Sequence, residues 1–172
     1  WFTITFFLIC LLIFPLSFGK DVNLDLNITI PAIWISTLFA NLIALGQMYK
    51  DDYSDGTLLY YYVNKISIAT LVFAKCLSHW IFSGLPIVII APLCSYIFTG
   101  NISGSNYLVL TLLLGTPILT LIGSPVSALM LGSSTRGPIL TFITLPFYLP
   151  IIIFGVMGSV DTNNNINAEF YL

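Results

Sequence analysis

Few side chains in this 172-residue sequence could carry chemistry. His79 is the only histidine, and it lies in KCLSHWIFSGLP beside Trp80. Ser78 precedes it, but adjacent helical residues point in different directions, so the two do not form a nucleophile and its base. Without a second convergent ligand, the sequence favours a hydrogen-bonded interfacial His79 over a heme ligand or a proton carrier.

No other set of residues supplies a reaction centre. A phosphate-binding loop of the form G-x-x-x-x-G-K-[ST] does not occur in the sequence. Cys10, Cys76 and Cys94 lie far apart in apolar surroundings, which indicates small buried side chains rather than metal ligands or a disulfide. We therefore expect no catalytic residue, no metal and no bound cofactor, and we expect any ATP hydrolysis to occur in a separate subunit.

Charge is concentrated in one stretch, KDDYSDGTLLYYYVNK, although charged residues make up only 7% of the sequence. Aspartates come first, where they suit the positive end of a helix dipole, and apolar residues then recur at steps of three and four. This pattern predicts a short amphipathic helix over residues 51–64, lying in the membrane interface with its tyrosines at headgroup depth. Periodicity alone favours a simple anchor, but an acidic and aromatic surface also suits docking of a cytoplasmic partner.

The elements that position this stretch are apolar helices. Hydrophobic residues make up 58% of the sequence and the mean hydropathy is +0.99, whereas charged residues alone form about a quarter of a soluble domain. A net charge of -2 excludes a basic nucleic-acid surface. The sequence predicts an all-α integral membrane protein, a polytopic helical bundle with 1–172 as a single transmembrane domain.

Five apolar segments are each long enough to cross a bilayer, which takes about 20 residues. They are Trp1–Phe18, Ile30–Met48, Cys76–Thr99, Tyr107–Leu131 and Ile139–Gly158. Four basic residues fall in the second and fourth connections (Lys50, Lys65, Lys75 and Arg136), against Lys20 alone on the other side. The positive-inside rule then places the charged stretch in the cytoplasm.

Small residues and prolines shape the spanning segments. Ser124, Ala128 and Gly132 repeat at steps of four, with Gly115 and Gly123 nearby, which allows close helix contact within the subunit or in a homodimer. Interior prolines remove backbone hydrogen bonds, so kinked helices are expected. The nine prolines are Pro15, Pro31, Pro86, Pro92, Pro117, Pro125, Pro138, Pro146 and Pro150.

The charged stretch and the segment after it, DDYSDGTLLYYYVNKISIATLVFAK, resemble the permeases of ABC-2-type transporters. More narrowly, the ordered blocks FPLSFG, DDYSDGTL, LSHWIFSGLPIVIIAPL, LLLGTPILTLIGSP and LPFYLPIIIFG are similar to CcmB, the heme exporter B family of cytochrome c maturation. This resemblance covers nearly the whole chain. It implies six spanning helices, of which five are visible, so the sequence is expected to be a fragment lacking both ends.

The resemblance also implies partners and a location. These are an ATPase subunit, CcmA, the membrane proteins CcmC and CcmD, and a functional link to the heme chaperone CcmE, whose heme-loaded form is released in an ATP-dependent step. Heme is then a transported or handled species, and ATP belongs to the partner subunit. Members of the family are proteins of the bacterial inner membrane, so that location is expected here. The mitochondrial inner membrane is the alternative.

On this resemblance the predicted helix becomes a coupling helix that docks on the ATPase. The residues expected to carry docking are Asp51, Asp52, Asp55, Gly56, Thr57 and Leu58. Two other functions stay open: an ABC-2-type exporter subunit for a lipid or polysaccharide, and a non-transport scaffold that holds heme-handling proteins together.

Overall fold

The computed structural model describes residues 2–18, 25–100, 105–132 and 136–169, and every element within those ranges is a helix. Four helices are long and apolar enough to cross a membrane, and a shorter apolar helix lies at the start of the chain. The predicted all-α polytopic fold is thereby confirmed. Lys20 and the side chain of Arg136, which entered the count of basic residues, lie outside the part that the structure describes.

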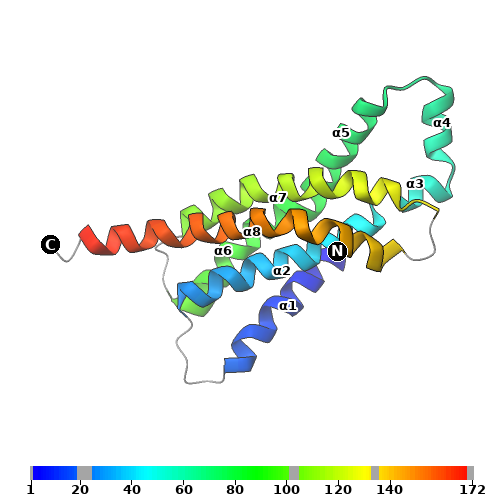
Figure 1. Ribbon diagram of the computed structural model, residues 1–172. Coiled ribbons are helices and arrows are strands. Elements are labelled where there is room, and N and C mark those ends of the chain that lie inside the picture. Colours follow the sequence, from blue (N-terminus) through cyan, green and yellow to red (C-terminus); the bar gives the residue numbers. More distant parts are fainter. Residues whose placement is uncertain (1, 19–24, 101–104, 133–135, 170–172) are drawn as a thin grey trace.

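The helices follow one another with short connections (Figure 1). Their bounds are α1 Phe2–Phe18, α2 Leu26–Gln47, α3 Lys50–Ser54, α4 Thr57–Val63, α5 Ile68–His79, a π-helical turn Trp80–Gly84, α6 Leu85–Thr99, α7 Ser105–Leu129 and α8 Arg136–Glu169. The α3–α4 segment, the end of α7 and the start of α8 lie at the same end of the bundle (Figure 1). That the second and fourth connections lie on one side of the membrane stays a prediction.

Helix α2 forms the centre of the bundle. It contacts α1, α6, α7 and α8, and its Trp34 is 0% exposed. Trp34 fits because the neighbouring helices present glycines to it: a Cβ on Gly115 of α7 or on Gly155 of α8 would overlap the indole ring. Gly123 of α7 likewise faces Leu45 of α2. At these positions the small residues of α7 serve contacts inside the subunit.

A single long helical element runs through α5, the π turn and α6. This element begins at Ile68, whereas the predicted segment began at Cys76. The prediction began late because Lys75 interrupts the apolar run in the sequence, but Lys75 lies within the helix. Pro86 follows the π turn, and a proline ring clashes with the carbonyl one turn before it, which favours a widened turn there. Helix α5 diverges from the bundle toward α4, whereas α6 packs within it (Figure 1).

Candidate functional site: the α3–α4 segment and its attachment to the bundle

The charged stretch forms two short helices, where the sequence predicted one. Helix α3 carries the first two aspartates and Tyr53, and α4 carries the other three tyrosines. Gly56 between the two helices has φ +74°. Glycine adopts this left-handed backbone without steric cost, so it ends one helix and redirects the chain into the next. Asp51 and Asp52 therefore lie on a different helix from the run of three tyrosines, and the two helices meet at a corner. We call residues 50–64 the α3–α4 segment.

The three aspartates of this segment differ in their surroundings. Asp51 and Asp55 are exposed, whereas the side chain of Asp52 is 17% exposed. Asp52 Oδ2 forms an ion pair with Lys75 Nζ of α5, across the gap between α3 and the long helix. Asp51 and Asp55 are thus available to a partner, while Asp52 is engaged within the subunit.

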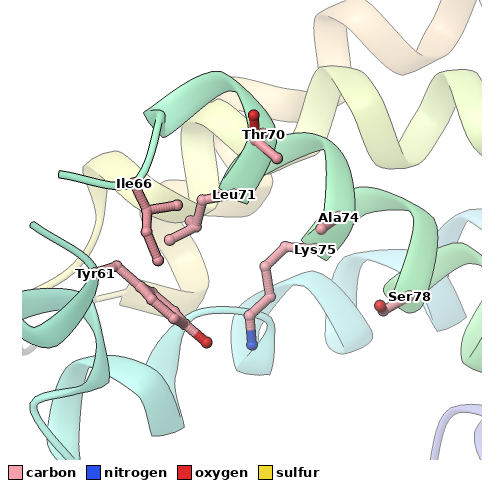
Figure 2. A pocket seen from close by; sticks show the side chains of 7 residues that line it. All are labelled: Tyr61, Ile66, Thr70, Leu71, Ala74, Lys75 and Ser78. Atoms are coloured by element: carbon pink, nitrogen blue, oxygen red, sulfur yellow. The ribbon is translucent and has the colours of Figure 1, made fainter. Parts of the chain in front are cut away.

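A groove lies between α4 and α5 beside this ion pair. Its volume is about 350 Å³, and Tyr61 and Ile66 form one wall while Leu71, Ala74 and Lys75 form the other (Figure 2). Lys75 points from α5 toward α3 in this view (Figure 2). The half-buried Tyr61 also packs edge-on against Tyr60, with ring centroids 6.1 Å apart. The groove is thus lined by residues of α4 and α5 and by Ile66 between them.

The outer surface of α4 is apolar and uncovered. Leu59, Tyr60, Tyr62 and Val63 are each between 64% and 77% exposed. Tyrosines combine an apolar ring with a polar tip, so this surface suits the depth of lipid headgroups or a protein interface. Of the other residues expected to dock, Thr57 and Leu58 are half-buried and Gly56 is exposed at the corner.

The last turn of α2 and Tyr49, the residue before α3, are held to α7 by hydrogen bonds. The hydroxyl groups of Tyr49 and Ser124 are hydrogen-bonded at 2.7 Å, and Ser127 Oγ donates to the carbonyl of Leu45 at 2.6 Å. Together with the ion pair to α5, these contacts tie α3 to two long helices.

His79 lies at the end of α5, next to the π turn. Its Nδ1 is 3.2 Å from Ser83 Oγ, and Ser83 Oγ donates to the His79 carbonyl at 2.6 Å. Among the residues that the structure describes, no group of three or more His, Cys, Asp or Glu side chains could hold a metal ion. The geometry near His79 is that of a local hydrogen-bonded pair.

Replacing Gly56 with alanine should loosen the α3–α4 corner without affecting the bundle. No heavy atom lies within 4 Å of the position that a Cβ would take, so the cost comes from the left-handed backbone alone, about 1–2 kcal/mol. We expect limited proteolysis in this segment to become several-fold faster while the midpoint of thermal denaturation stays the same. Gly56→Asn is the control, since asparagine tolerates this backbone better than alanine. Equal proteolysis of both variants and the parent would contradict the explanation.

A bundle of apolar helices, four of them within the described residues long and apolar enough to cross a membrane, with an acidic and aromatic segment at one end, defines a polytopic membrane protein. Comparison with known proteins identifies the family to which this membrane protein belongs. The family model described as CcmB protein matches residues 1–172. The chain belongs to the CcmB family.

Curated relatives carry the name Heme exporter protein B. The protein of Pseudomonas aeruginosa is 35% identical over 152 residues, which cover 88% of this chain and 68% of the relative. That of Escherichia coli K12 is 34% identical over 167 residues, covering 97% of this chain and 76% of the relative. That of Rhodobacter capsulatus is 34% identical over 152 residues, covering 88% and 70%.

Proposed function

We propose that this chain is the membrane permease subunit of an ABC-type heme exporter that acts in cytochrome c biogenesis. Its membership in the CcmB family and the name shared by its relatives support this function. The proposed complex contains the ATPase CcmA and the membrane proteins CcmC and CcmD, and it assists release of the heme-loaded chaperone CcmE. The proposed location is the inner membrane of a bacterium.

The observation that carries the proposal is the position of the α3–α4 segment. It stands at one end of an apolar bundle, carries exposed Asp51 and Asp55, and is tied to α5 through Asp52 and to α7 through Tyr49. A partner that binds this segment and displaces it would also move two long helices. ATP binding in CcmA would move this segment, and the long helices would follow, provided that the two positions differ in affinity for the partner.

The acidic residues of the segment divide into two roles under this proposal. Asp51 and Asp55 meet the ATPase, and Asp52 passes the displacement to α5 through Lys75. A substitution of Asp52 therefore mixes docking with internal attachment. The docking test is cleaner when it leaves Asp52 in place.

Reversing the two exposed charges should weaken capture of the ATPase. In Asp51→Lys/Asp55→Lys, like charges would face each other in place of complementary ones, and we expect recovery of CcmA in a pull-down of the complex to fall about tenfold. Ser67→Lys is the matched control, because Ser67 is exposed just beyond the segment and its side chain makes no helix-capping bond. Undiminished recovery of CcmA in the double variant would rule out docking through these aspartates.

The substrate needs a separate test. Levels of c-type cytochromes should fall when the gene is deleted and return when it is supplied, which an exporter of lipid or polysaccharide would not produce. A scaffold without transport would be recognised by an ATPase-dead CcmA: normal cytochrome levels with that partner would favour the scaffold and overturn the exporter.

A further inference from the structure

The groove between α4 and α5 continues into a second, larger hollow. This hollow has a volume of about 660 Å³, and it shares Tyr61, Ile66 and Leu71 with the hollow of about 350 Å³ beside the ion pair. Leu58 of α4 and Ile68 of α5 add apolar side chains to its wall. Pockets of about 300–1,000 Å³ with mainly apolar walls are typical of binding sites. We call the two hollows together the α4–α5 groove.

The chain itself covers little of this groove. Helix α4 packs on α3 but makes no extensive contact with α5 within the described residues, so the two walls stand apart. Ile66 and Ile68 are 42% and 75% exposed, and Tyr61 and Leu71 are only half-buried. Removing apolar surface from water is favourable. The groove therefore favours an occupant that brings an apolar group.

The depth of the groove decides between lipid and protein as its occupant. Exposed charges flank the α3–α4 segment at both ends, at Lys50 and Lys65, and an exposed charge in the hydrocarbon core is strongly unfavourable. Lys75 on the α5 wall is charged as well, and Ile68 precedes it by seven residues, which is about 10 Å along a helix. A headgroup layer is only about 5–8 Å thick. The acyl chains of the bilayer therefore end short of the apolar wall at Ile68, and a protein is the better occupant.

We propose that the ATPase subunit inserts one apolar side chain, such as leucine or phenylalanine, into the α4–α5 groove. This inference rests on the proposed function and specifies a contact of the partner named there. Its support is the position of the groove. Lys75 in the groove wall is paired with Asp52 of α3, and α3 also carries the exposed Asp51 and ends just before the exposed Asp55. A partner that meets these two aspartates therefore lies beside the groove.

The arrangement matches the usual anatomy of a protein interface. An apolar anchor fills a pocket at the centre of such an interface, and charged groups surround the anchor at the rim. The α4–α5 groove supplies the pocket, and Asp51 and Asp55 supply a rim that is complementary to basic residues of the ATPase. Rim charges mainly steer and orient the partner, whereas a filled pocket slows its dissociation. The two parts of the surface therefore make separable contributions to binding.

Filling the groove from its α5 wall should exclude the ATPase. Ala74 is exposed on that wall (Figure 2), so the indole ring of Ala74→Trp would occupy the space of the partner's side chain. We expect recovery of CcmA in a pull-down of the complex to fall about tenfold. Ala69→Trp is the matched control, because Ala69 is exposed on the same helix but lines neither hollow. Its recovery of CcmA should equal that of the parent, and both variants should reach the membrane in the parent's amount.

Photo-cross-linking in the assembled complex identifies the occupant directly. A benzophenone amino acid at position 74 should cross-link to CcmA, and the same amino acid at position 69 should not. A cross-link from position 74 to lipid alone, or undiminished recovery of CcmA with Ala74→Trp, would overturn the inference. Position 55 separates this result from failure of the proposed function. A cross-link to CcmA from position 55 but not from position 74 rejects the groove and keeps the docking, whereas no cross-link to CcmA from either position rejects both.

Discussion

Gly155→Ala should destabilise the folded bundle by about 1–3 kcal/mol, and Gly155→Val should reduce the yield of folded protein still further. A Cβ on Gly155 would lie 2.6 Å from Trp34 Cη2 and 2.7 Å from Cε2. The indole ring cannot move aside, because it is 0% exposed and Gly115 of α7 approaches it as well. Helix α8 would have to separate from α2, and the central packing of the bundle would be lost.

Gly46→Ala is the matched control for this prediction. Gly46 also lies in a helix, but no heavy atom stands within 4 Å of the position that its Cβ would take. Alanine there should be neutral or stabilising by up to about 1 kcal/mol, because glycine is the poorer helix former. Both variants can be compared by size-exclusion profile and thermal midpoint in the same mild detergent. Equal behaviour of the two alanine variants would show that Trp34 is not held between glycines.

Reversing the charge at either end of the Asp52–Lys75 pair should impair the protein, and reversing both ends should restore it. Asp52→Lys or Lys75→Asp places like charges together at a site where the side chains are 17% and 31% exposed. Exposed pairs contribute about 0–1 kcal/mol and breaking a buried pair costs about 3–5, so we expect a cost of about 1–3 kcal/mol at this half-buried site. The double variant re-forms the pair with its polarity exchanged.

The measurement combines stability with function. Each single variant should lower both the thermal midpoint of the complex and the level of c-type cytochromes, and the double variant should recover most of both. Lys65→Asp is the control, since Lys65 is exposed nearby and takes no part in this pair. If the double variant behaves as the sum of the singles, Asp52 and Lys75 do not act together, and α5 receives no displacement through them.

The helical character of the chain could be predicted from its apolar runs, since nothing but helices satisfies the backbone of such segments in lipid. The start of the third apolar segment could not be predicted in this way. Lys75 looked like the end of a polar connection, but it lies within α5 and its side chain pairs with Asp52. The predicted helix over 51–64 missed the break at Gly56, although Asp55-Gly56 is a common signal for the end of a helix.

The functional residues of the segment were only partly foreseen. The charge pattern selected Asp51, Asp52 and Asp55 together, but it could not show that Asp52 faces inward while the other two are exposed. That difference depends on the angle between α3 and α5, which local patterning does not determine. Docking through these residues remains a prediction.

Four buried polar side chains of α2 and α7 were not singled out in the sequence. Thr37 and Asn41 stand four residues apart on α2, and Thr116 and Thr120 do so on α7, which places each pair on one face of its helix. That spacing was a usable signal. The spacing gave no indication that the two faces meet. A polar residue in a spanning helix can also stand alone, or face lipid while its side chain bonds to a carbonyl of its own helix.

The central position of α2 has a consequence for how the protein is made. Two thirds of its apolar window, 67%, is buried, against 22% for the window in α8. Yet α6, α7 and α8, which cover α2, are synthesised after it. Until those helices are made, Thr37 and Asn41 lack the helices that cover them in the finished fold. The environment of α2 is therefore complete only after α8 has been made and has packed against Trp34.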